Sequence, residues 1–199
     1  MSIEVRRIDL PDVSVNEVRR YAGIGGNDNR SDELMEIALA FSKKAKNTVV
    51  FGVFDVKCQG YKVDLGFSEV ESRGLSRMLS ECDKAIVMCA TAGLDFDIAA
   101  KKYGRTSPAL ALLIGAVGSE RIEALCDEFC REVSLQLDAK GFKLTPRFSP
   151  GYGDLPLEFQ KEVFSALTPE KYIGVTLGES LMMTPIKSVT AIAGIRKKK

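Results

Sequence analysis

The order of its patterned segments constrains this chain more than any other feature. Residues 48–67, 84–90 and 187–195 have the β-branched, aromatic or alternating apolar composition of strands. Helical periodicity comes in a block instead: three helical stretches follow one another between Leu94 and Ala139, the last two separated at Gly118. Strands and helices therefore do not alternate as in a βαβ fold. We predict an α+β fold with a twisted, largely antiparallel sheet flanked by helices.

Local signals place several elements. Ser14 and Glu17 have the spacing of a capping box and open a short helix that ends at Gly23. The glycine-rich run 23–30 follows a helix and lacks the lysine of a phosphate-binding loop, so an ordinary loop is predicted. Gln59-Gly60 indicates a turn, which makes 48–67 a hairpin or meander.

Further strands are predicted on both sides of the helical block. The short, almost entirely apolar run Lys84–Ala90 is typical of a central strand, and Ile173–Leu177 and Lys187–Ile195 are two more. No repeat or linker divides the chain. We therefore predict one domain over 1–199, with N-terminal helices and a hairpin in 1–70.

Composition excludes several classes of function. The formal net charge of +1 is too small for a dedicated nucleic-acid binder. The longest apolar stretch, Ala109–Gly118, is about half of the ~20 residues that a membrane-spanning helix needs. The N-terminus has no apolar signal core. We expect a cytoplasmic protein without nucleic-acid or membrane partners.

The cysteine and histidine counts limit the chemistry. Five scattered cysteines without a CxxC pair indicate reduced thiols. Cys126 and Cys130 share one face of a helix, but no histidine exists to complete a metal site, so buried core positions are the preferred interpretation. The absence of histidine also excludes Ser-His-Asp and Cys-His catalytic units. The composition favours binding and positioning over acid–base catalysis.

The segment Arg147–Asp154 is the least ordinary part of the sequence. Pro150-Gly151-Tyr152 predicts a fixed turn in which the glycine permits close backbone approach and the tyrosine offers a ring face and a hydroxyl. Arg147 offers a planar fork for a carboxylate or phosphate. Spacing alone favours the alternative, a structural loop whose arginine pairs with a local Asp or Glu.

Several blocks in the same order resemble one family. Arg147-Phe-Ser-Pro-Gly-Tyr152, followed by Asp154 and Pro156, resembles the RxxPGY signature of the activation domain of cobalamin-dependent methionine synthase. Val175–Pro185 with Ser188-Val189 resembles a second block of that domain. The stretches 82–93 and 118–127 resemble free-standing versions of it. The resemblance is clearest over 71–195, and because ordered blocks are more specific than one motif, it outweighs the alternative of a structural loop.

The resemblance implies a role and a site. Such domains bind S-adenosylmethionine in a shallow groove of an α+β fold and present its methyl group to cobalamin held by another domain or subunit. The implied function is an accessory subunit that supports reductive remethylation of cob(II)alamin on a core methionine synthase, with flavodoxin or another one-electron donor. The chain would thus take part in methyl transfer without a catalytic residue or metal ligand of its own. The binding residues implied are Arg147, Ser149, Pro150, Gly151, Tyr152, Glu123 and Glu179.

The chain also departs from the family. An acidic ligand contact near the domain's N-terminus and a tyrosine-bearing segment after the final strand have no counterpart here, so the partner of the ligand's ammonium group is not identified. Modules for cobalamin, homocysteine and folate do not fit in 199 residues. Two further functions stay open: reactivation of another corrinoid protein, and a non-catalytic module that senses S-adenosylmethionine. An ordinary methyltransferase is disfavoured, because no glycine-rich strand–turn–helix is present.

Overall fold

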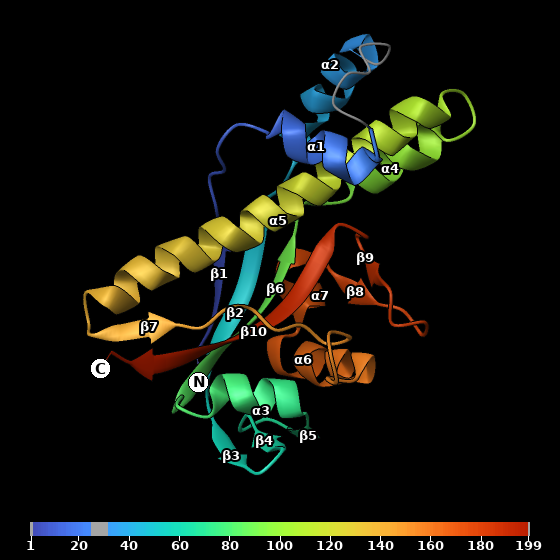
Figure 1. Cartoon of the computed structure of the whole chain (residues 1–199). Coiled ribbons are helices and arrows are strands. Elements are labelled where there is room, and N and C mark those ends of the chain that lie inside the picture. The colour runs from blue at the N-terminus through green and yellow to red at the C-terminus, as the bar shows by residue number, and fades with distance from the viewer. Residues whose placement is uncertain (1, 25–31, 199) are drawn as a thin grey trace.

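The computed structural model describes residues 2–24 and 32–198. Its main sheet has five strands in the order β1-β2-β6-β10-β7, and all neighbours are antiparallel (Figure 1). The strands are β1 (Ile3–Arg7), β2 (Thr48–Asp55), β6 (Lys84–Thr91), β7 (Phe142–Leu144) and β10 (Ser188–Lys197). The prediction of an α+β fold with a largely antiparallel sheet is confirmed.

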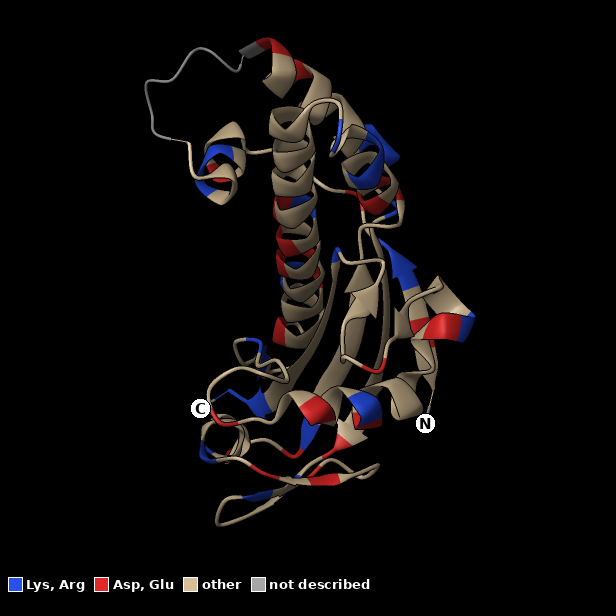
Figure 2. Ribbon diagram, turned by 90° about the vertical axis from the view of Figure 1, so that its right-hand side faces the viewer, with Lys and Arg blue, Asp and Glu red and all other residues tan. Residues whose placement is uncertain are grey.

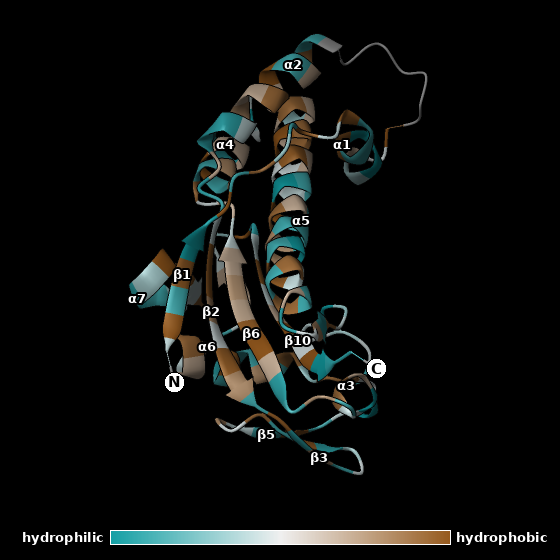
Figure 3. Ribbon diagram, turned by 90° about the vertical axis from the view of Figure 1, so that its left-hand side faces the viewer, coloured by the Kyte–Doolittle hydropathy of each residue, from teal (hydrophilic) through white to brown (hydrophobic). Residues whose placement is uncertain are grey.

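Strand β6 lies at the centre of the sheet, as its sequence predicts. Its side chains alternate between two hydrophobic cores: Ile86 and Met88 belong to one, and Val87 and Cys89 to the other. Figure 3 shows hydrophobic colour along β6, between α5 and the elements of the opposite face. Because both faces of the sheet are covered, β6 has no polar face, and this explains its unbroken apolar run.

Helices cover both faces of the sheet. One core contains residues of the sheet and of the helix α5 (Pro108–Asp138), which covers one face. It continues to the helices α1 (Val15–Ala22), α2 (Asp32–Ala40) and α4 (Asp95–Tyr103) and the 3₁₀ turn η2 (Phe41–Lys44), which pack around α5 beyond the end of the strands (Figure 1). The other lies between the sheet and α3 (Arg73–Leu79), η3 (Leu157–Phe159), α6 (Gln160–Leu167) and α7 (Pro169–Ile173). Helix α5 crosses the whole length of the sheet (Figure 1).

Two small sheets complete the fold. One is a meander of β3 (Lys57–Gln59), β4 (Lys62–Asp64) and β5 (Glu69–Glu71), and the other a hairpin of β8 (Thr176–Leu177) and β9 (Met183–Thr184). The predicted meander over 48–67 is therefore correct only in its second half, around a turn at Gly60. The first half, β2, joins the main sheet, because Val56 is buried and its N–H donates to Asp83 O at 2.9 Å, which separates β2 from β3.

The helix predictions have mixed outcomes. Helix α1 is confirmed, with Ser14 accepting a hydrogen bond from Glu17 N and Gly23 in the left-handed region at φ 68°. Residues 25–30 of the predicted loop 23–30 lie outside the described residues. The predicted break at Gly118 is wrong, because α5 is continuous through it.

The predicted strand Ile173–Leu177 is reduced to the two residues of β8. Its first residue, Ile173, ends α7, and Gly174 terminates that helix in the left-handed region at φ 69°. Strand β10 matches its prediction closely.

Charged residues of both signs occur together along the elements. Figure 2 shows acidic and basic residues interspersed along the helices and the sheet edges in the view that it gives. Within the described ranges, no helix is long and apolar enough to cross a membrane.

Candidate functional site

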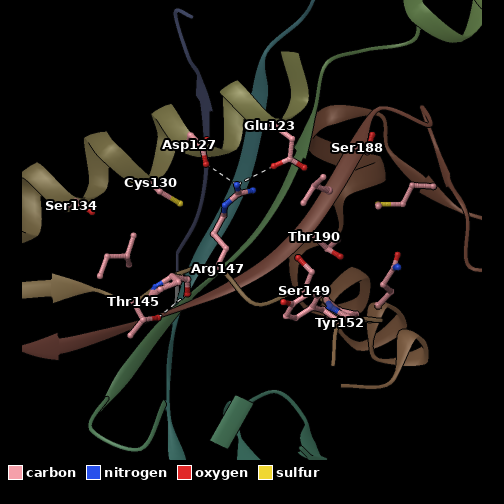
Figure 4. Close-up of a pocket in the computed structure, with 16 residues that line it drawn as sticks. Glu123, Asp127, Cys130, Ser134, Thr145, Arg147, Ser149, Tyr152, Ser188 and Thr190 are labelled. Carbon is pink, nitrogen blue, oxygen red and sulfur yellow. Dashed lines mark hydrogen bonds and ion pairs between the residues drawn. The ribbon is translucent and has the colours of Figure 1, made fainter. Parts of the chain in front are cut away.

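Four of the predicted site residues lie together. Arg147, Ser149, Pro150 and Tyr152 line a groove of about 760 Å³, here called the Arg147 groove. It is formed where α5, the loop after β7, the start of α6, β9 and the beginning of β10 meet (Figure 4). Glu123, the fifth predicted residue, contributes from α5. The volume is within the range of about 300–1,000 Å³ typical of small-molecule sites.

The loop that carries Arg147 runs alongside β10 as an irregular extra strand. Phe148 and Ile192 exchange two backbone hydrogen bonds of 2.8 Å each, and Thr145 N donates to Gly194 O at 2.9 Å. Because neighbouring side chains of an extended chain point to opposite sides, Phe148 packs into the core and Arg147 faces the groove. Pro146 and Pro150 have no backbone N–H to donate, so they are suited to an irregular strand of this kind.

Arg147 reaches across the groove to α5. Its Nη2 donates to Glu123 Oε2 at 3.1 Å and to Asp127 Oδ1 at 2.7 Å (Figure 4). The arginine side chain is 22% exposed, whereas that of Asp127 is 74% exposed. The pairing of the arginine with acidic residues, the alternative favoured by spacing alone, therefore does occur. Its partners are not local, however, because they lie 24 and 20 positions away in the sequence. The pairing forms part of the groove wall.

The Pro-Gly-Tyr turn is fixed by its own backbone. Gly151 has φ +84° and its N–H donates to Leu155 O at 2.9 Å, while Tyr152 N donates to Ser149 O at 3.0 Å. A Cβ at Gly151 would lie 3.0 Å from the Leu157 side chain. Gly151 thus shapes the turn and is not among the groove-lining residues. Tyr152 remains 68% exposed, and its ring packs edge-on against Phe148, with ring centroids 5.5 Å apart.

Asp154 anchors this turn to α3. Its carboxylate accepts hydrogen bonds from Ser72 Oγ at 2.6 Å, Arg73 N at 2.6 Å and Gly74 N at 3.1 Å. The Ser72 hydroxyl and the two amides together hold the pKa of Asp154 below its usual range. Asp154 therefore positions the turn that presents Tyr152.

Glu179 lies apart from the other predicted residues. It is exposed in the turn between β8 and β9 and is not among the residues that line the groove. Only Met183 of that hairpin reaches the groove. The structure thus brings five of the seven predicted residues to one groove and uses Gly151 as support.

Several groove residues were not predicted. They include Asp127, Cys130, Gln160, Met183, Ser188 and Thr190. Asp127 had a usable signal, because it follows Glu123 by four positions and so lies on the same face of α5. Cys130 shares this signal, because it follows Asp127 by three positions on the same helix. Gln160, Met183, Ser188 and Thr190 come from other elements, and no local pattern connects them with α5.

The cysteines have the predicted core character for the most part. Cys126 is fully buried, and burial raises the pKa of its thiol to about 12. Cys130 is partly buried at the groove, where burial again raises the pKa. In the part of the chain that the structure describes, no group of three or more Cys, Asp or Glu side chains could hold a metal ion.

Comparisons with known proteins identify the fold. No protein-family model matches the chain, and no curated protein matches it in sequence. Among solved structures, it is similar to the MetH reactivation domain bound to AdoHcy, with a TM-score of 0.68 and 16% identity. The match covers 100% of this chain and 80% of that one. The chain therefore has the fold of the MetH reactivation domain.

Proposed function

We propose that this chain binds S-adenosylmethionine in the Arg147 groove and supports reductive remethylation of cob(II)alamin on a cobalamin-dependent methionine synthase in the cytoplasm. The observation that carries the proposal is one groove with an arginine and two carboxylates at one end and an exposed tyrosine ring at the other. The fold match supports it, because that reactivation domain is bound to AdoHcy, the demethylated form of this ligand.

The charged end of the groove complements an amino acid. Both contacts of Arg147 use Nη2, so a ligand carboxylate can take the arginine fork only if one of the two acids moves away. Asp127 is the acid free to move, since its side chain is the more exposed. Once displaced, Asp127 can pair with the ligand's ammonium group. This exchange supplies the ammonium partner that the sequence did not identify.

The balance of charge also suits this ligand. Two carboxylates against one guanidinium leave the groove negative. S-adenosylmethionine carries two cationic groups, the ammonium and the sulfonium, against one carboxylate. Partial burial of Arg147 strengthens these interactions relative to those in bulk water.

For methyl transfer, this chain positions the methyl donor and its partner supplies the reactive group. Cobalamin, held by the partner, supplies a strong nucleophile, and methyl transfer from a sulfonium needs alignment and exclusion of water and no proton transfer. A chain without histidine is sufficient for that task. The exposed Tyr152 and Asp127 leave the groove open on one side, where a cobalamin-bearing partner can approach. Flavodoxin or another one-electron donor completes the system.

Calorimetric titration with S-adenosylhomocysteine tests the binding site. Arg147→Ala should weaken binding about 30-fold, since hydrogen bonds to charged groups contribute roughly 1.5–3 kcal/mol. Arg131→Ala is the matched control: Arg131 is an exposed arginine that pairs with Glu128 on α5 and does not line the groove. Equal affinity for the wild type and Arg147→Ala would show that the groove is not the site.

A second assay tests the role. The chain is added to a core methionine synthase that holds cob(II)alamin, together with reductant and S-adenosylmethionine, and the cobalamin spectrum is followed. Remethylation faster than without the chain supports the proposal. Binding without acceleration would instead favour the sensing module or a different corrinoid partner.

A further inference from the structure

One polar side chain in the groove wall has no partner. Gln160, the first residue of α6, is only 5% exposed and lines the Arg147 groove. Its Oε1 is buried and accepts no hydrogen bond from any residue in the described ranges. Buried amide oxygens are nearly always hydrogen-bonded, so one left unpaired at the wall of a binding groove points to a donor on the ligand.

Gln160 belongs to the uncharged part of the groove lining. The charged lining residues are Arg147, Glu123 and Asp127, and Figure 4 shows the guanidinium turned toward α5, away from Tyr152. Figure 4 shows Ser149 and Thr190 beside Tyr152, and the other lining residues, among them Met183 and Gln160, carry no charge. A ligand whose amino-acid end pairs with Arg147 therefore places its aromatic end beside Tyr152 and Gln160.

We propose that Gln160 recognises the adenine edge of the bound ligand. Its terminal amide turns so that Oε1, which is buried in the unliganded protein, accepts a hydrogen bond from the exocyclic amino group, while its Nε2 donates to the neighbouring ring nitrogen. A carboxamide forms this donor–acceptor pair with adenine. Tyr152 meets the face of the base and Gln160 its edge, so the two residues together select an aminopurine. This inference rests on the proposed function of the groove.

The backbone of Gln160 is held in place by the helix that it begins. Gln160 is held at the start of a helix whose Val163 and Leu167 are fully buried, so its side chain is presented from a rigid element. An unpaired buried carbonyl also destabilises the protein without ligand. Gln160 should therefore lower the free energy of unfolding of the unliganded protein and make binding selective for aminopurines. An apolar replacement should raise that free energy and remove the selectivity.

Two ligands and one variant test this. The ligands are S-adenosylhomocysteine and its analogue in which hydrogen replaces the 6-amino group, both titrated calorimetrically. The wild type should bind the amino form about tenfold more tightly, because the analogue leaves Oε1 unpaired. Gln160→Leu should bind the two ligands equally, with an affinity close to that of the wild type for the analogue. Its urea unfolding midpoint should be higher than that of the wild type.

Lys161→Leu serves as the control, because Lys161 is exposed on the same helix and does not line the groove. It should keep the tenfold preference. A wild type without preference between the two ligands overturns the inference, as does a Gln160→Leu variant that retains it. In either case, weakened binding by Arg147→Ala still supports the groove as the site. If the wild type binds neither ligand, the inference and the proposed site fail together.

Discussion

Among single residues, Asp154 shows how the site depends on a side chain outside it. Its carboxylate fixes the Pro-Gly-Tyr turn to the first turn of α3 through Ser72, Arg73 and Gly74. A Cβ at Gly74 would lie 2.8 Å from the Phe148 ring, so the turn and the helix are in close contact. Tyr152 therefore owes its position to a tether 80 residues away in sequence.

Asp154→Asn should destabilise the protein in a pH-dependent way. The folded state holds the pKa of Asp154 below 3.8, mainly through the Ser72 hydroxyl. A carboxyl group with a depressed pKa stabilises the fold above its unfolded-state pKa, and this contribution is lost as the pH falls through the folded-state pKa. Urea unfolding should show a lower midpoint for Asp154→Asn at pH 7 and a narrowing difference below pH 3.8. A difference that stays constant with pH would contradict this role.

At the site, the sequence predicts those groove residues that lie close together in the chain. Arg147, Ser149, Pro150 and Tyr152 fall within the six positions 147–152, and all four line the groove. Gln160 was missed because its significance depends on burial beside a groove, which no local pattern encodes. Glu179 was included through the resemblance, and the turn of the β8–β9 hairpin places it outside the groove.

Among the elements, α5 shows why a glycine misled the prediction. The sequence predicts a break at Gly118, yet the helix continues, because the missing side chain makes room for close packing. A Cβ there would lie 2.9 Å from Phe96 and 3.0 Å from the stem of Lys187. Phe96, whose side chain fills the space beside Gly118, belongs to α4. The packing of α4 against α5 therefore overrides the low helix propensity of Gly118.

Two glycines in α5 offer a matched test of that explanation. Gly118→Ala should lower the free energy of unfolding by about 1–3 kcal/mol, because the added methyl group clashes with the buried Phe96. A Cβ at Gly115 meets nothing within 4 Å, so Gly115→Ala should raise it by up to about 1 kcal/mol through helix propensity. Urea unfolding of both variants measures this. Stabilisation by both would show that Gly118 is no packing position.

The strands were predictable in proportion to their burial. Strand β6 is apolar because both of its faces are covered, and this run identified a central strand without any contact information. The boundary between β2 and β3 could not be predicted in this way, because β-branched residues continue through Val56. What divides the two strands is the hydrogen bond from Val56 N to Asp83 O, a partner 27 residues away that is visible only in the folded chain.

For the whole molecule, the Arg147 groove is a product of the complete fold. Its walls come from α5, the loop after β7, α6, β9 and β10, which span positions 123–190. A ligand that contacts all of these elements binds only the folded protein, so it should also stabilise the fold. Binding must then be distinguished from general stabilisation, and the cysteines provide a way to do so.

Cys130 should report ligand binding through its reactivity. Cys130 and Cys58 are both partly buried thiols whose pKa is raised by burial, but only Cys130 lines the groove. Alkylation by iodoacetamide at mildly alkaline pH, followed by peptide mass spectrometry, measures both rates. With S-adenosylhomocysteine at ten times its Kd, the rate at Cys130 should fall about tenfold, in proportion to the unliganded fraction. The rate at Cys58 should stay unchanged. Equal slowing of both cysteines would indicate only general stabilisation, and no slowing at Cys130 would place the ligand elsewhere.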